Sequence, residues 1–259
     1  MESLSIWLKF ARAIEHLEAV KATIAQDIST YGDLDQFIVE AQGKETLELL
    51  EPGPLISRCV GEFVYQLRST LDHLAFDLVK INRRGIALPS KWDENCGFPI
   101  WTNLPKGHTA PLPYGAFGNL PGIPIEAHTL IEKVQPYYPA GTGSVNTSLK
   151  FLNALSNIDK HRRFTLTRVR AKVRHRVLYK SGFRGESLDT VDHGAEIPTP
   201  FAGENDPVVD VERSMSLTVA FDEGDALGDA SGVPIDDLLE NISTDVWGRV
   251  IDPLRRFMG

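Results

Sequence analysis

Residues 54–83 read PLISRCVGEFVYQLRSTLDHLAFDLVKINR, and this stretch decides how the rest of the chain is organised. Its apolar residues recur every three or four positions, which is the spacing of one face of an α-helix. This face consists of Ile56, Val60, Phe63, Leu67, Leu71, Leu74, Leu78 and Ile81. Tyr65 and Phe76 fall on the opposite side of the same helix. A helix that is apolar on more than one face is typical of a central helix or of a subunit interface, so we predict one of these positions for it.

Helical spacing also recurs on both sides of this stretch. Further helices are predicted at residues 5–29, Ile125–Val134, 145–158 and Pro234–Phe257. Between Gly85 and Gly143 the chain is rich in proline and glycine, and apart from the short helix at 125–134 we expect this segment to wrap the core. Seven aromatic residues are expected to anchor the wrap: Trp92, Phe98, Trp101, Tyr114, Phe117, Tyr137 and Tyr138.

Three regions show the patterns of β-strands. The runs Gln36–Gln42 and Glu45–Leu50 flank Gly43 and predict a short hairpin, which needs a helix to pack against because an isolated two-stranded ribbon is marginal in water. In Thr167–Tyr179 one face holds basic residues and the other holds Val169, Ala171, Val173, His175 and Val177, and Val208–Phe221 is a further strand region. We therefore predict an α+β fold with a helical core, one long central helix, a small antiparallel sheet and a long Pro/Gly-rich wrapping segment.

Length and composition narrow the possible classes of protein. A chain of 259 residues with 42% hydrophobic residues can bury a substantial core, and we predict one domain spanning 1–259. Within it, the helical core covers about 1–160, a β-rich part about 162–222 and the closing helix about 234–257. The formal net charge of −8 excludes a nucleic-acid surface over the whole molecule but allows a local basic patch. Because no apolar segment is long enough to span a bilayer or to serve as a secretion signal, the cytoplasm is the predicted location.

The central helix carries the first candidate site, Arg68-Ser69-Thr70-Leu71-Asp72-His73. On an ideal helix Arg68 and His73 differ by about 140° in azimuth, so both flank the polar side of the apolar stripe and can reach one cavity or one interface. A histidine can exchange a proton near neutral pH, and an arginine can hold a phosphate with two hydrogen bonds. This pair suits the cleavage of a phosphodiester. The alternative is that Arg68–Asp72 and His73–Asp77 are ordinary ion pairs within the helix.

The pattern R-x-x-x-x-H resembles the signature of the HEPN (higher eukaryotes and prokaryotes nucleotide-binding) superfamily, many members of which are metal-independent endoribonucleases. The resemblance implies that Arg68 stabilises the scissile phosphate and that His73 acts as general acid or base. It also implies a homodimer in which two copies of the motif meet to form one active site.

A longer part of the chain resembles a set of uncharacterised bacterial proteins. The resemblance rests on four segments in order, QLRSTLDHLAF, CGFPI, VQPYY and NIDKHRRF, and it spans most of residues 60–165. It implies no known activity. It does imply that the two histidine-containing segments belong to one architecture.

The second candidate site is Asp159-Lys160-His161-Arg162, at the predicted end of a helix. Asp159 lies on the side of Leu152 and Leu155 and therefore needs a partner, for which Arg68, His73 and His161 are available. By ligand type, Asp72, His73, Asp159 and His161 could also hold a metal ion, but no local spacing fixes such a geometry. Alternatively, His161 and Arg162 are cations that favour a helix C-terminus. No cofactor is predicted, because Gly141-Thr142-Gly143-Ser144 lacks the lysine of a phosphate-binding loop.

The third candidate is the basic face of the strand at 167–179. A ridge of this kind can follow an RNA backbone through salt-sensitive contacts. The alternative is pairing with acidic residues of a neighbouring strand, namely Asp206, Asp210 and Glu212. The predicted substrate-binding residues are Arg162, Arg168, Arg170, Lys172, Arg174 and Arg176.

Together these features lead to a first functional hypothesis, metal-independent cleavage of RNA by an Arg68/His73 pair. Asp72 would orient one of the two side chains, Asp159 and His161 would complete the catalytic set, and the basic ridge would hold RNA. The competing hypothesis is a non-catalytic binding or assembly protein in which the Arg, Asp and His motifs stabilise the packing of helices.

Overall fold

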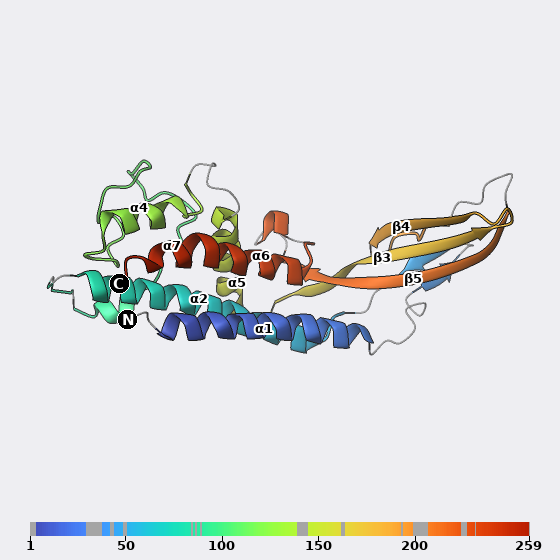
Figure 1. Cartoon of the computed structure of the whole chain (residues 1–259), viewed down its shortest axis with the longest axis horizontal. Helices are drawn as coiled ribbons and strands as arrows, with labels where there is room; N and C mark the ends of the chain where they lie inside the picture. Colours follow the sequence, from blue (N-terminus) through green and yellow to red (C-terminus); the bar gives the residue numbers. More distant parts are fainter. Residues whose placement is uncertain are drawn as a thin grey trace.

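The computed structural model describes residues 4–29, 38–41, 44–48, 51–83, 85, 87–88, 90–138, 145–161, 164–192, 194–198, 207–223, 227–230 and 232–258. The predicted α+β class is confirmed. The molecule is elongated: helices gather in a helical body at one end, and the strands extend from it as a sheet arm (Figure 1). Within the described part of the chain, no helix is long and apolar enough to cross a membrane.

The helical body is built around α2 (Pro54–Asn82), as the sequence predicts. α1 (Leu4–Ser29) lies along it, and α5 (Val145–His161) and α6 (Ile235–Asp245) complete the bundle (Figure 1). The apolar stripe of α2 is buried up to Leu78, whereas Ile81 in the last turn is 47% exposed. The closing helix is confirmed in three parts: α6, a π-helical segment η4 (Val246–Ile251) and α7 (Asp252–Arg255).

The wrapping segment forms α4 (Ile125–Lys133) as predicted, and an additional single turn, α3 (Trp92–Asn95). Trp92, Phe98 and Phe117 are buried in the main hydrophobic core and anchor the wrap. Tyr114 is not buried: its side chain is 55% exposed, its hydroxyl donates to the carbonyl of Ile123 at 2.7 Å, and its ring lies 5.5 Å from that of His128.

The sheet arm has β3 (Leu166–Tyr179) at its centre, antiparallel to β4 (Arg184–Asp192) and β5 (Val208–Phe221). The predicted hairpin is formed by β1 (Ile38–Ala41) and β2 (Lys44–Leu47). The hairpin packs mainly against the sheet and not against a helix. Leu47 is buried among apolar residues of the sheet, and Ile28 of α1 packs against this cluster while remaining partly exposed. The alternating pattern of β3 explains this, because its apolar face needs a cover that the hairpin provides. The second, smaller core consists of Leu47, Ala171, Val173, Val191, Ile197 and Leu217.

Between the hairpin and the sheet lies a polar network centred on His175, which is fully buried. Arg213 on β5 donates from Nε to His175 Nε2 at 3.2 Å, and its Nη2 lies 2.7 Å from Oε2 of Glu45 on β2. Burial and the adjacent Arg213 guanidinium lower the pKa of His175 below its usual range. His175 is therefore neutral in the folded arm, where its Nε2 can accept the hydrogen bond from Arg213.

We expect the sheet arm to lose stability as the pH falls below about 6.5, the ordinary pKa of histidine. Since the folded state holds His175 neutral, the unfolded chain takes up the proton first, and stability present above pH 6.5 is lost progressively below it. Amide hydrogen exchange at pH 7.5 and 5.5, corrected for intrinsic rates, measures this in β3 and β5. His175→Gln keeps an acceptor for Arg213 but cannot titrate, so its arm should lose this dependence. Equal pH dependence in wild type and variant would contradict the assignment.

Candidate functional site

Arg68 and Asp72 form an ion pair on α2 that also binds the backbone of the wrapping segment. Arg68 Nη2 lies 3.1 Å from Asp72 Oδ1 and donates to the carbonyl of Phe98 at 2.6 Å. The N–H of Phe98 in turn donates to Asp72 Oδ1 at 2.9 Å. Arg68 Nη1 is buried and has no hydrogen-bond partner among the described residues. The guanidinium is therefore committed to holding Phe98, and the predicted Arg68–Asp72 pair is present.

The loop before Phe98 is fitted closely to this pair. A Cβ atom on Gly97 would lie 3.0 Å from Asp72 Oδ1, so a side chain there would press against the carboxylate. Burial, with a smaller contribution from the Asp72 carboxylate, raises the pKa of the Cys96 thiol to about 12. Cys96 thus stays a neutral thiol near pH 7 and is not a candidate nucleophile.

The next part of the loop is held by Gln135, which follows α4 and is fully buried. Its side-chain amide donates to the carbonyl of Pro99 and accepts from the N–H of Trp101, at 2.9 and 2.8 Å. Three of the four segments that resemble the bacterial set, QLRSTLDHLAF, CGFPI and VQPYY, are therefore joined by hydrogen bonds. Arg68, Asp72 and Gln135 all bind the backbone of residues 98–101.

His73 and His161 differ from Arg68 in that neither has a hydrogen bond or ion pair to any described residue. His73 is partly buried on α2, and the predicted His73–Asp77 pair is not formed; Asp77 Oδ2 is buried without a partner in the described chain. His161 is exposed at the end of α5. Arg162 lies outside the described residues.

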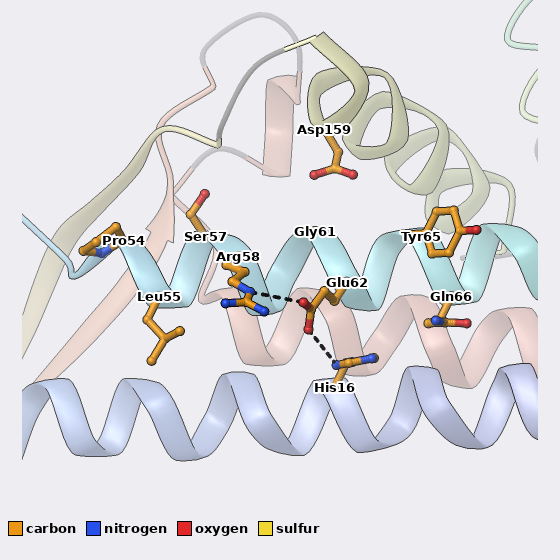
Figure 2. Close-up of a pocket in the computed structure, with 10 residues that line it drawn as sticks. All are labelled: His16, Pro54, Leu55, Ser57, Arg58, Gly61, Glu62, Tyr65, Gln66 and Asp159. Atoms are coloured by element: carbon orange, nitrogen blue, oxygen red, sulfur yellow. Dashed lines mark hydrogen bonds and ion pairs between the residues drawn. The ribbon is translucent and has the colours of Figure 1, made fainter.

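Asp159 lies apart from the Arg68–Asp72 pair, over a groove bounded by α1, α2 and the C-terminal end of α5 (Figure 2). Its carboxylate points toward Gly61 on α2, two helical turns before Arg68, so the predicted pairing of Asp159 with Arg68 or His161 is not formed. The residue is exposed, not turned inward with Leu152 and Leu155, although partial desolvation beside α2 raises its pKa above the ordinary value. The groove has a volume of about 940 Å³.

The wall opposite Asp159 carries three polar residues in contact with one another. Glu62 accepts a hydrogen bond from Arg58 Nε at 3.2 Å, and its other oxygen lies 3.3 Å from His16 Nδ1 (Figure 2). Glu62 is thus paired, whereas Asp159 has no partner among the described residues. Of the residues that line the groove, His16, Arg58, Gly61 and Glu62 were not predicted from the sequence. A signal for Gly61 was available, because a glycine inside a helix usually marks a close contact.

The basic ridge on β3 is confirmed for the side chains that the structure describes, since Lys172, Arg174 and Arg176 are all exposed. Two of them have acidic partners: Arg174 Nε lies 3.1 Å from Glu186 on β4, and Arg176 Nη1 lies 3.6 Å from Glu212 on β5. The alternative of pairing with the acidic strand thus holds for Arg176, while Arg174 pairs with the strand on the other side of β3. Arg168 and Arg170 lie on β3, but their side chains are outside the described residues, as are Asp206 and the segment Gly141–Ser144.

A metal site is not formed by the residues proposed for one. Among the described residues, no group of three or more His, Cys, Asp or Glu side chains is placed to hold a metal ion. Asp72 faces Phe98 while Asp159 faces Gly61, so these two carboxylates do not converge.

In comparisons with protein-family models, with curated proteins and with solved structures, this chain matched none.

Proposed function

We propose that this protein is a non-catalytic binding protein whose partner occupies the groove between α1, α2 and α5. The observation that carries the proposal is the engagement of Arg68: its Nη2 binds both Asp72 and the carbonyl of Phe98, and its Nη1 is buried. A guanidinium held in this way stabilises the packing of the wrapping segment on α2. It would have to be released before it could grip a phosphate.

We infer the binding surface by separating the motif side chains that already have partners from the one that has no described partner. Arg68, Asp72 and Gln135 form hydrogen bonds with the backbone of the loop at 97–101. Asp159, by contrast, has no described partner and lines a groove of about 940 Å³. A pocket of this size with a few placed polar groups is the usual form of a binding site.

A second candidate function is metal-independent cleavage of RNA in the cytoplasm by a homodimer. One observation favours it: His73 has no partner in the described chain, which leaves its imidazole available for proton transfer. Arg68 lies on the same helix, five residues earlier, in the arrangement of the HEPN signature. Lys172, exposed on the sheet arm and without a described partner, could contact the RNA backbone.

A cleavage assay separates the two functions. Labelled RNAs of mixed sequence are incubated with wild type and with His73→Ala, with a chelator present throughout. A binding protein is expected to leave the RNA intact in both samples. RNA that is cut by wild type but not by a folded His73→Ala protein would replace the binding proposal with the ribonuclease. The variant is suitable because replacing His73 breaks no hydrogen bond or ion pair to a described residue.

A further inference from the structure

Gly61 makes room for the Asp159 carboxylate. A Cβ atom at position 61 would lie 2.5 Å from Asp159 Oδ1, closer than non-bonded atoms approach. Glycine in the middle of a helix is unfavourable relative to alanine. Gly248 shows that not every helical glycine of this chain is needed for space, because a Cβ atom there would meet nothing within 4 Å. At position 61 the small residue allows a carboxylate to sit directly on the floor of the groove.

The Asp159 carboxylate has no partner among the described residues around the groove. Glu62 is engaged by both Arg58 and His16, so neither of these two side chains reaches Asp159. The Asp159 side chain is exposed where it lines the groove, so a ligand can reach its carboxylate. A ligand that brings a positive charge gains a charge-assisted hydrogen bond there. An anionic ligand would meet the negative charge of Asp159 instead.

The shape of the groove suits an extended chain. Its floor on α2 runs from Pro54 to Gln66, a rise of about 18 Å at 1.5 Å per residue, which corresponds to about five residues of extended peptide. Near its two ends lie Leu55 and Tyr65, exposed by 51% and 61%. The Tyr65 ring makes a cation–π contact with Lys9, whose Nζ lies 5.7 Å from the ring centre. The groove thus offers apolar contacts toward its ends and a carboxylate between them.

We propose that the groove binds an extended peptide segment of a partner through a lysine or arginine side chain that pairs with Asp159. This inference rests on the proposed binding function and adds the chemistry of its ligand. The ammonium or guanidinium group would approach the carboxylate above Gly61. Flanking apolar side chains of the segment would contact Leu55 and Tyr65.

The test uses three fluorescently labelled pentapeptides of sequence Ala-Leu-X-Leu-Ala, in which X is lysine, norleucine or glutamate. Fluorescence anisotropy measures their binding to the full chain. The lysine peptide is expected to bind more tightly than the other two. Asp159→Asn should weaken it on the order of 10- to 100-fold, the effect of losing a charge-assisted hydrogen bond. Glu15→Gln is the matched control, since it removes an exposed acid of α1 that does not line the groove.

A second variant moves the Asp159 carboxylate without changing any charge. Gly61→Ala displaces Asp159 and should also weaken the lysine peptide, while Gly248→Ala should not. In the wild type, NMR titration of the Asp159 carboxyl carbon should show a pKa that falls when the lysine peptide is bound, because a nearby cation favours the charged form.

Each result bears on the proposal separately. Absence of lysine-peptide binding, or binding that is unchanged by Asp159→Asn, would overturn the Asp159 site. Binding of all three peptides with equal affinity would overturn the role of charge while leaving a binding function intact. A wild type that sediments as a dimer and an Asp159→Asn variant that sediments as a monomer would identify a second copy as the occupant and overturn the peptide assignment. His73-dependent cleavage of RNA would instead remove the proposed function itself.

Discussion

Replacing Arg68 with alanine is expected to lower the free energy of unfolding by about 3 kcal/mol. The variant loses the donor to the carbonyl of Phe98 and the partner of Asp72, and hydrogen bonds to charged groups contribute roughly 1.5–3 kcal/mol each without being additive. Part of this is discounted because the side chains of Arg68 and Asp72 keep some contact with water. Chemical denaturation of wild type and variant measures the difference.

His73→Ala is the matched control, five residues further along the same helix. Because His73 has no described partner, its replacement should change stability by no more than about 0.5 kcal/mol. Arg68→Lys should fall between the two, since it keeps the charge but not the planar group. An Arg68→Ala protein as stable as wild type would contradict the structural role of the ion pair. It would also strengthen the second candidate function, in which Arg68 is free to bind phosphate.

The second large effect is expected at Arg213, which joins the hairpin to the sheet arm. Arg213→Ala removes the hydrogen bonds to His175 and to Glu45 and leaves both groups without their donor, at a cost of about 2–3 kcal/mol. Because the hydrophobic core of the arm is small, little other burial stabilises the arm when these hydrogen bonds are lost. The arm should therefore open locally while the helical body stays folded.

Hydrogen exchange followed by mass spectrometry tests this regional effect. Amides of β3 and β5 should exchange about 30- to 150-fold faster in Arg213→Ala, which corresponds to the expected loss of free energy at 1.4 kcal/mol per factor of ten. Amides of α2 should be unaffected. The control is Arg176→Ala on the opposite face of the sheet, whose ion pair with Glu212 is exposed and worth less than about 1 kcal/mol. Uniform acceleration over both parts would show that the arm and the body unfold as one unit.

The proposed binding function and the structural role of Arg68 both depend on where the fold places the motif residues. Residues that lie near one another in a short motif are often assumed to act together. Here Arg68 and Asp72 fix the loop at 97–101, His73 is left unused, and Asp159 lies over a different part of α2. The common feature of the four segments is therefore the wrap around α2 and the groove beside it.

Periodicity in the sequence was sufficient for the main elements. The stripe from Ile56 to Leu78 required a long buried helix, and the alternation in β3 required a strand with one apolar and one basic face. Both patterns arise from the repeat of a single element, so they can be read without knowing what packs against it. The i,i+4 spacing of Arg68 and Asp72 likewise predicted their ion pair. The π-helical segment within the closing helix left no such signal.

The choice of partner depended on the tertiary structure. Phe98 lies 26 and 30 residues from Asp72 and Arg68, and Glu45 lies 168 residues from Arg213. No local rule connects positions so far apart, because such contacts form only when the wrap closes over α2 and the hairpin covers β3. Asp159 illustrates the limit: its place on α5 predicted a partner, but the packing of α5 on α2 brought it to Gly61, where it is exposed and has no partner among the described residues. The sequence thus determined which residues are polar and which faces are apolar, while the tertiary structure decided which of the described charges are paired.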